Sequence, residues 1–333
     1  MRVLVVKMSS LGDVVHTLPA LTDAAAAIPG IRFEWVVEEA FAEIPAWHPA
    51  VDRVIPIALR RWRKTPLKSF GGPEWRACRQ ALRKTHYDAV IDAQGLLKSA
   101  LVARMVRAPR YGMDRSSARE PLAALAYHHT LPVAREMHAV ERTRSLFAQA
   151  LGYTLPQARG DYGVRAHLQA VSEEQPPSLL FFHGTARAEK LWPVEHWQAL
   201  AALAVAAGYK VWLPWGSDAE RERAGEVAAA VEGAVVLPRL DLLGLASMLL
   251  EVAGAVAVDT GLGHLAAALD VPAVSLYGPT DTRLIGAYGR NQLHIESPLA
   301  DAGADDALAM MAAIEPELVW SRLCEILPKG PGQ

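Results

Sequence analysis

The sequence predicts an α/β protein made of two Rossmann-like domains whose parallel sheets face a central cleft. Two observations predict this class. Short apolar, β-type runs alternate with longer helical patterns through the 333 residues. A polar, proline-containing segment interrupts the alternation once, at 165–178, and strands resume directly after it. Strands that are apolar on both faces and alternate with helices are typical of parallel sheets covered on both sides.

The expected elements follow from this alternation. The strands are expected at 3–6, 33–37, 54–57, 89–91, 179–182, 210–213, 234–237, 255–258 and 273–277. One helix is expected at 196–207, between Pro193 and Gly208, and a terminal amphipathic helix at 316–327 with Leu318 among its apolar residues. The predicted domains are 1–165 and 179–327, joined by a linker at 166–178.

Composition limits the class of protein. A hydrophobic fraction of 51% with 21% charged residues is typical of a globular protein. The two cysteines, Cys78 and Cys324, have no metal spacing and suggest a reducing compartment, and no apolar run is long enough for a signal peptide or a membrane span. Residues 1–150 hold 22 Lys and Arg against 14 Asp and Glu, whereas the remainder holds 12 against 22. This asymmetry indicates an anionic partner for the first half, unless it is chance clustering on a solvated surface.

The loop after the first strand reads KMSSLGDVVH at 7–16. In a doubly wound sheet this loop lies at the ligand cleft. It is not G-x-G-x-x-G, so a dinucleotide site is poorly supported. Asp13 has two interpretations: it caps the following helix, or its carboxylate faces the cleft as a general base.

The run AVAVDTGLGH at 255–264 is the most informative stretch of the chain. Asp259, Thr260 and Gly261 follow an apolar strand, and His264 would lie in the first turn of a helix expected at 265–269. A glycine-rich strand-to-helix turn exposes backbone N–H groups that bind phosphate. The alternative is an ordinary tight turn with Asp259 as the helix N-cap.

Two further segments of the second half add to a phosphate site. The loop FHGTARAEKLWP at 182–193 carries Thr185, Arg187 and Lys190, whose cations would neutralise a diphosphate unless they are solvated surface residues. Glu220 follows the next strand, where an acid would bind ribose hydroxyls or simply lie on an exposed helix.

The first half contains the dense basic cluster RRWRK at 60–64, followed by Lys68. This cluster comes directly after the third expected strand, which indicates recognition of a polyanion near the cleft. No helix-turn-helix or RNA-binding motif points to nucleic acid, and no Cys/His cluster or paired acids point to a metal. The sequence also has no P-loop and no G-x-S-x-G motif.

Taken together, these motifs resemble the ADP-heptose:lipopolysaccharide heptosyltransferases, most closely the heptosyltransferase I group. The likeness runs through nearly the whole chain and includes the segments 5–21, 55–64, 92–99, 258–265 and 277–281. The resemblance implies a GT-B fold and an inverting transfer of L-glycero-D-manno-heptose from ADP-heptose to the inner Kdo of Kdo2-lipid A. It implies no cofactor and no metal.

The resemblance also implies roles for individual residues. Asp13 matches the catalytic base and Lys190 the lysine that contacts the donor phosphate. The donor-binding positions are Thr185, Ala186, Lys190, Glu220, Leu240, Asp259, Thr260, Gly261 and His264. Ala186 stands where family members carry a second threonine. The acceptor-binding positions are Ser10, Arg60, Arg61, Arg63, Lys64, Lys98, Arg119, His138 and Arg142.

The expected partners are therefore ADP-heptose, Kdo2-lipid A and an anionic membrane surface, not nucleic acid. The expected location is the cytoplasm, with peripheral attachment to the inner membrane through the basic face. The alternatives are heptosyltransferase II, another GT-B nucleotide-sugar enzyme such as an epimerase, and a nucleotide-binding protein without activity.

Overall fold

The computed structural model describes residues 1–65, 71–170, 176–300 and 306–328. The chain forms two compact units, Met1–His167 and Leu168–Gln333. Residues 171–175 of the predicted linker lie outside the described residues, as does Lys68 of the basic segment. No helix in the described ranges is long and apolar enough to cross a membrane.

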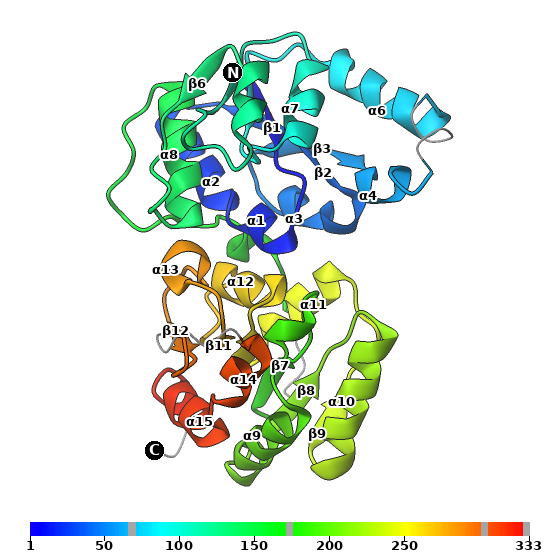
Figure 1. The fold of residues 1–333 in the computed structure, drawn as a ribbon, viewed down its shortest axis with the longest axis vertical. Coiled ribbons are helices and arrows are strands. Elements are labelled where there is room, and N and C mark those ends of the chain that lie inside the picture. Colours follow the sequence, from blue (N-terminus) through cyan, green and yellow to red (C-terminus); the bar gives the residue numbers. More distant parts are fainter. Residues whose placement is uncertain (66–70, 171–175, 301–305, 329–333) are drawn as a thin grey trace. The chain divides into compact units, whose positions relative to one another are not determined.

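The first unit is built on a parallel sheet of six strands, in the order β3-β2-β1-β4-β5-β6 (Figure 1). The strands are β1 (Arg2–Val6), β2 (Arg32–Glu38), β3 (Val51–Ile57), β4 (Ala89–Asp92), β5 (Arg110–Met113) and β6 (His129–Leu131). The helices are α1 (Leu11–Val15), α2 (Leu18–Ala27), η1 (Glu39–Phe41), α3 (Glu43–Ala46), α4 (Leu59–Trp62), α6 (Pro73–Lys84), α7 (Leu97–Arg104), η2 (Pro121–Ala126), α8 (Ala139–Leu151) and η3 (Arg165–His167).

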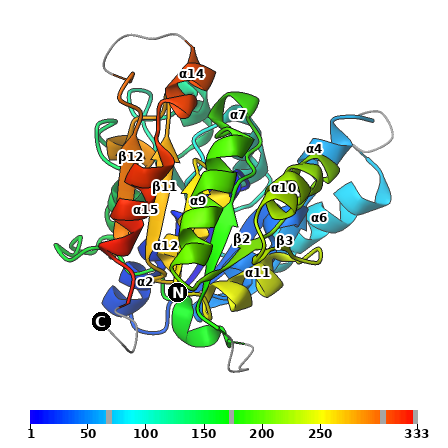
Figure 2. The same cartoon turned by 90° about the horizontal axis from the view of Figure 1, so that it is seen from below.

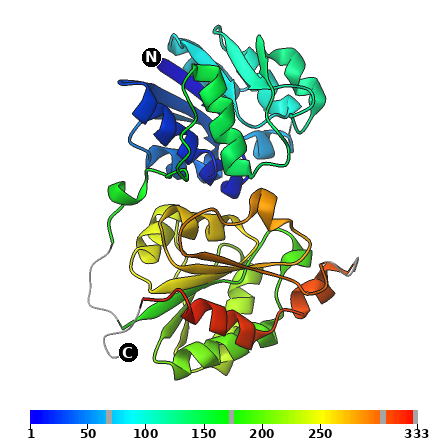
Figure 3. The ribbon, with the colours of Figure 1, turned by 90° about the vertical axis from the view of Figure 1, so that its left-hand side faces the viewer.

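Helices cover both faces of this sheet because its central strand is apolar on both faces. In β1, Leu4 and Val6 pack in one cluster with Leu82 of α6 and Val102 of α7. Val3 and Val5 of β1 are also fully buried. Because side chains alternate along a strand, these two point to the opposite face of the sheet. Helices α2 and α8 pack against each other on that side, and Figure 3 shows them adjacent in blue and green.

The second unit repeats the same architecture. Its parallel sheet has the order β12-β11-β10-β7-β8-β9. The strands are β7 (Ser178–Phe182), β8 (Lys210–Leu213), β9 (Ala234–Val236), β10 (Gly254–Val258), β11 (Ala273–Tyr277) and β12 (Gln292–Glu296). The helices are η4 (Ala188–Lys190), α9 (Val194–Ala206), α10 (Asp218–Ala230), α11 (Leu242–Leu249), α12 (Gly261–Ala268), α13 (Thr282–Ile285), α14 (Ala307–Ala312) and α15 (Pro316–Cys324).

The core of the second unit is a cluster between the sheet and helices α9, α10 and α15. Trp192 and Trp197 are almost wholly buried in it, with their rings edge to face at 4.9 Å between centroids. Val319 and Leu323 bring α15 against α9, and Figure 2 shows these two helices side by side. Helix α12 contacts β10 and β11.

The predicted α/β class with two parallel sheets is confirmed, and all nine expected strands are present, eight of them within one residue at each end, whereas β3 begins three residues earlier than expected. Three strands were missed: β5, β6 and β12. Each of them lies toward one edge of its sheet, where a short strand with charged, tyrosine or histidine positions gives no apolar run. The prediction that Leu318 lies on the apolar side of the last helix is wrong, because its side chain is 47% exposed.

The strand order places one reversal point in each unit. The chain moves outward from β1 toward β3 and then returns to β4 on the other side of β1, and β7 and β10 repeat this relation. In open α/β sheets, ligands bind at the carboxyl ends of the two strands that flank such a reversal. The loops that follow β1, β4, β7 and β10 are therefore the positions where a site is expected.

Candidate functional site

The reversal point of the first unit holds an ion pair between Lys7 and Asp13. Lys7 directly follows β1, and Asp13 lies in α1, the helix that begins after the loop. The Lys7 Nζ is 3.4 Å from Asp13 Oδ1, and the Lys7 side chain is 10% exposed against 36% for Asp13. The other carboxylate oxygen, Oδ2, accepts hydrogen bonds from the Ser10 backbone N–H at 2.8 Å and the Ser10 hydroxyl at 2.9 Å.

Asp13 therefore caps the helix, and this role does not exclude that its carboxylate acts as a general base. Ser10 is the N-cap of α1, and Asp13 reaches back to it from the third helical position, as in a capping box. Burial disfavours the charged carboxylate, but the Lys7 ammonium and the bonds from Ser10 outweigh burial and lower the pKa of Asp13. The carboxylate is consequently ionised at neutral pH and partly open to solvent, which are the two conditions that a proton acceptor needs.

The loop after β4 fixes the loop after β1. The Gln94 side-chain oxygen accepts from the backbone N–H groups of Met8 and Ser9 at 2.8 and 3.1 Å. Lys7 Nζ donates to the Ala93 carbonyl at 3.0 Å, and Lys98 Nζ donates to the Ser9 hydroxyl at 3.3 Å. Lys98, an expected acceptor contact, is thus brought to the same reversal point as Asp13.

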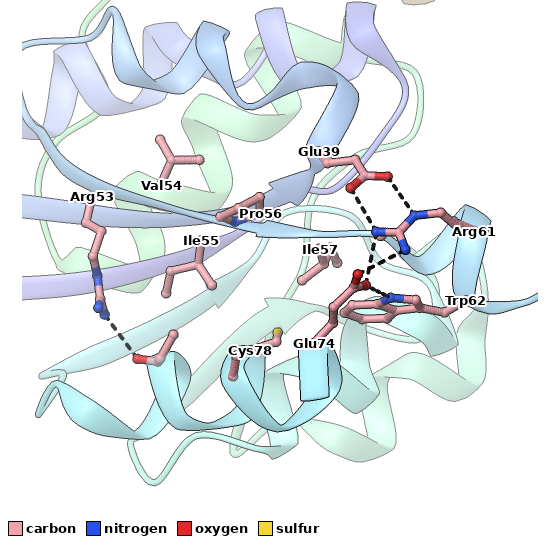
Figure 4. A pocket seen from close by; sticks show the side chains of 13 residues that line it. Glu39, Arg53, Val54, Ile55, Pro56, Ile57, Arg61, Trp62, Glu74 and Cys78 are labelled. Atoms are coloured by element: carbon pink, nitrogen blue, oxygen red, sulfur yellow. Dashed lines mark hydrogen bonds and ion pairs between the residues drawn. The ribbon is translucent and has the colours of Figure 1, made fainter. Parts of the chain in front are cut away.

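The basic cluster lies at the carboxyl end of β3, the edge strand, and two of its residues, Arg61 and Trp62, line a pocket of about 440 Å³ (Figure 4). Apolar residues of β3 and α6 form much of the pocket lining. At its rim, Arg61 lies between Glu39 and Glu74, at 3.2 and 3.0 Å. The Trp62 indole N–H donates to Glu74 at 2.8 Å. The Arg61 charge is therefore already balanced by two carboxylates.

The other cations of the cluster are more available. Arg60 is exposed and lies over the Phe41 ring, with its guanidinium carbon 5.3 Å from the ring centroid. Arg63 and Lys64 are exposed, and neither forms an ion pair within the described ranges. Glu38, at the end of β2, connects the cluster to the reversal point, because it accepts the Arg60 backbone N–H at 3.2 Å and its charge interacts with Lys98. Burial raises the pKa of Glu38.

The remaining expected acceptor residues differ in their surroundings. Arg119 is exposed beside Gly95, in the segment that follows β5. His138 is the N-cap of α8, and its Nδ1 accepts from the Val140 backbone N–H at 3.2 Å. Arg142 donates to the Ser117 carbonyl at 2.7 Å, and burial together with a neighbouring arginine lowers its pKa.

The reversal point of the second unit holds a second ion pair, between Lys190 in η4 and Asp259 after β10. Lys190 Nζ donates to the Asp259 carboxylate, and both side chains are about nine-tenths buried, at 11% and 9% exposure. The same carboxylate oxygen accepts from the Thr280 hydroxyl at 2.6 Å, and the Thr185 hydroxyl donates to the Asp259 carbonyl at 3.1 Å. The expected proximity of the two loops is confirmed.

Two alternatives and one helix boundary from the sequence are now decided. The interpretation of Asp259 as a helix cap is wrong, because Thr260 is the N-cap of α12 and Asp259 pairs with Lys190. Helix α12 begins at Gly261, four residues earlier than expected, so the glycine-containing segment belongs to the helix. Lys190 is a buried partner, whereas Arg187 is the solvated residue, 64% exposed and paired with Glu189.

Helix α12 begins at this reversal point, and the N-terminus of an α-helix is a favourable place for an anion. Gly263 lies against the sheet, since an added Cβ would be 3.1 Å from the Ala257 side chain. His264 is buried, with 7% exposure. The helix therefore approaches β10 closely while its positive end stays beside Asp259 and Thr260.

Glu220 combines a capping role with a position beside β7. Its Oε2 accepts from the backbone N–H groups of Gly216 and Ser217 at 2.7 and 3.0 Å, so it caps α10. A Cβ at Gly184 would lie 2.4 Å from its other oxygen, Oε1. Glu220 is half-buried, as is Leu240, which precedes the N-cap of α11, whereas Ala186 is exposed.

Three residues at these points carry no predicted role: Lys7, Gln94 and Thr280. All three stand in motifs that the sequence singled out, but each has a partner more than 20 positions away in the chain, so only the fold reveals these contacts. The described ranges contain no group of three or more His, Cys, Asp or Glu side chains placed to hold a metal ion.

The sequence and the fold are both similar to those of known proteins. The model of glycosyltransferase family 9 (heptosyltransferase) matches residues 75–307. The chain is 60% identical to lipopolysaccharide heptosyltransferase 1 of Pseudomonas aeruginosa, over 89% of this chain and 84% of the relative. The chain belongs to glycosyltransferase family 9.

The solved structures agree with this membership. The Escherichia coli heptosyltransferase WaaC with ADP superposes with a TM-score of 0.90 at 47% identity, over 98% of this chain and 99% of that one. The E. coli ADP-heptose lipopolysaccharide heptosyltransferase II has a TM-score of 0.76 at 22% identity, over 98% of each chain, and shares the fold. The family 9 enzyme described here is therefore a heptosyltransferase with the GT-B-like architecture.

Proposed function

We propose that this enzyme transfers L-glycero-D-manno-heptose from ADP-heptose to the inner Kdo of Kdo2-lipid A during assembly of the lipopolysaccharide core. The observation that carries the proposal is a comparison within one organism. The chain is 51% identical to lipopolysaccharide heptosyltransferase 1 of Salmonella typhimurium and 25% identical to lipopolysaccharide heptosyltransferase 2 of the same strain. This difference favours the first heptosyl transfer over the second.

The donor chemistry rests on the second unit. WaaC, with 47% identity, has been solved with ADP and with ADP-2-deoxy-2-fluoro heptose. In this chain the Lys190 ammonium, which is paired with Asp259, lies at one reversal point together with the Thr260–Gly261 backbone and the N-terminus of α12. Such a group binds the diphosphate and stabilises the negative charge that develops on ADP as the sugar–phosphate bond breaks. Glu220 and Leu240 are then placed for the nucleoside, with Thr185 and His264 beside the phosphates.

The acceptor chemistry rests on the first unit. The acceptor hydroxyl oxygen attacks the anomeric carbon, the bond from that carbon to the phosphate oxygen breaks, and ADP leaves with the bonding electrons. The hydroxyl proton passes to the ionised Asp13 carboxylate. Attack from the face opposite the leaving ADP inverts the anomeric centre. Lys7 and Ser10 hold Asp13 in position before the transfer.

Acceptor recognition is assigned to the cations of the first unit. Arg60, Arg63, Lys64 and Lys98 offer positive charge to the Kdo carboxylates and the lipid A phosphates, while Arg61 shapes the cluster through its two carboxylate partners. Arg119, His138 and Arg142 complete the expected acceptor set. No metal or cofactor is needed in this scheme, and the enzyme works as a peripheral protein on the cytoplasmic face of the inner membrane.

The test is release of ADP with two acceptors, Kdo2-lipid A and the same acceptor already carrying one heptose. We expect turnover with the first and little with the second. Preference for the heptosylated acceptor would assign the chain to the second transfer. Turnover of UDP-sugars in place of ADP-heptose would favour another nucleotide-sugar enzyme, and donor binding without turnover on either acceptor would favour a binding protein.

A further inference from the structure

The first unit exposes a group of leucines on α7 and η2. We name Leu97 and Leu101 of α7 and Leu122 and Leu125 of η2 the leucine platform. Leu101, Leu125 and Leu122 are 64%, 62% and 60% exposed, which makes them the three most exposed large apolar side chains among the described residues. Leucines are normally buried, and neighbouring exposed ones indicate a surface that contacts something apolar.

The platform is one surface because its two elements pack together. Ala100 of α7 lies in a buried cluster with Ala123, Ala124 and Ala126 of η2. Within each element the leucines share a face, since their spacing is four residues in the α-helix and three in the 3₁₀ helix. The small alanines turn inward and allow close approach, so the large leucines face outward (Figure 1 labels α7).

The platform is also held rigidly on the sheet. The Tyr127 hydroxyl donates to the buried Asp92 carboxylate at the end of β4, at 2.8 Å. The Glu120 carboxylate accepts the Leu97 backbone N–H at 2.6 Å, and the Glu120 N–H donates to the Gly95 carbonyl at 3.0 Å. The two ends of η2 are therefore tied to the last residue of β4 and to the segment that follows it. The exposed leucines are a fixed feature, not the result of a frayed loop.

Cations outnumber acids in the segment that contains the platform. Residues 97–130 contain six Lys and Arg against two acidic residues. Arg104 follows Leu97 by seven residues and so continues its helical face. Arg83 Nε donates to the Met105 carbonyl at 3.3 Å, at the end of α7, and Arg107 follows two residues later. None of these three arginines has an ion-pair partner in the described part of the chain, and all three are exposed.

We propose that the leucine platform is a membrane-docking surface that inserts into an anionic lipid leaflet while its arginines bind the headgroups. An apolar patch beside unpaired cations fits such a leaflet, because lipid tails accept the leucines and anionic headgroups the guanidinium groups. A protein partner would need carboxylates to match these arginines. The choice of a membrane rests on the proposed function, since Kdo2-lipid A is held in a bilayer.

The test is co-sedimentation of the full chain with vesicles that lack Kdo2-lipid A, so that binding does not depend on the active site. We expect binding to vesicles of phosphatidylcholine with phosphatidylglycerol and little binding to phosphatidylcholine alone. Leu101→Ser with Leu125→Ser should lower the partition coefficient at least about tenfold. Arg104→Gln with Arg107→Gln should lower it by about 30-fold, an effect that high salt should reproduce in the wild type.

The matched control is Leu308→Ser with Leu318→Ser in the second unit, where the side chains are 57% and 47% exposed. This control should bind vesicles like the wild type. Heptosyl transfer in detergent micelles is measured in parallel. The platform variants should keep this activity, so the measurement separates the docking proposal from the proposed function. Vesicle binding that is unchanged in both platform variants would overturn the docking proposal and leave the proposed function intact. A platform variant that instead dissociates a dimer in sedimentation velocity would also overturn it, in favour of a self-association surface.

Discussion

Removal of Lys190 should have two consequences that can be separated, one for stability and one for ADP binding. In Lys190→Met the apolar part of the side chain remains, but among the described residues the Asp259 carboxylate keeps only Thr280 as a side-chain hydrogen-bond partner. Because both members of the pair are about nine-tenths buried, the loss leaves an uncompensated buried charge. Breaking such a pair costs about 3 kcal/mol in the free energy of unfolding.

The double variant Lys190→Met with Asp259→Asn removes that charge as well. Its free energy of unfolding, measured by urea denaturation, should return to within about 1 kcal/mol of the wild type. ADP affinity should not return. A charge-assisted hydrogen bond to phosphate contributes about 1.5–3 kcal/mol, so ADP should bind roughly 10- to 150-fold more weakly to both variants.

Isothermal titration calorimetry with ADP measures the second effect, and Lys190→Arg is the control that keeps the positive charge. Recovery of wild-type ADP affinity in the double variant would refute the reasoning. Lys190 would then serve only to neutralise Asp259.

Further predictions concern the first unit and the absence of metal. Asp13→Asn should lower kcat by about 10²- to 10⁴-fold with ADP affinity unchanged, whereas a wild-type rate would reduce Asp13 to a helix cap. Lys7→Gln removes the cation that lowers the pKa of Asp13, so the acid limb of the kcat/KM profile should move to higher pH; an unmoved limb would contradict the pairing. Arg63→Ser with Lys64→Ser should raise the acceptor KM about tenfold or more without weakening ADP binding, and an equal loss of donor affinity would count against the division of roles. Activity should survive EDTA. If EDTA abolished activity and Mg²⁺ restored it, a metal and not Lys190 would stabilise the leaving group.

The sequence predicts the parts of this fold that depend on local pattern. Apolar runs predict nine strands, including the edge strands β3 and β9, and the parallel alternation predicts that the loop with Lys190 lies close to Asp259. The sequence does not predict the strands β5, β6 and β12, because their residues are too polar to form an apolar run. Hydrogen bonds between distant residues could not be predicted for a different reason. Gln94 contacts Ser9, which lies 85 positions away, and no local sequence pattern records such a contact.

The charge of the basic cluster was also overestimated from composition alone. Four cations in five residues suggested four free charges, but Arg61 is paired with both Glu39 and Glu74, which lie 22 and 13 residues away. The sequence contains these carboxylates, but only the packing of α4 against η1 and α6 brings them to Arg61. The acceptor assignment therefore depends more on Arg63 and Lys64 than the sequence implied.

The most direct test of the central claim is the mass of purified Kdo2-lipid A after incubation with the enzyme and ADP-heptose. The account predicts a product heavier than the acceptor by one heptose residue, formed by the wild-type chain and almost absent with Asp13→Asn. An acceptor whose mass does not change with the wild-type chain, under conditions where ADP-heptose is bound, would contradict the account.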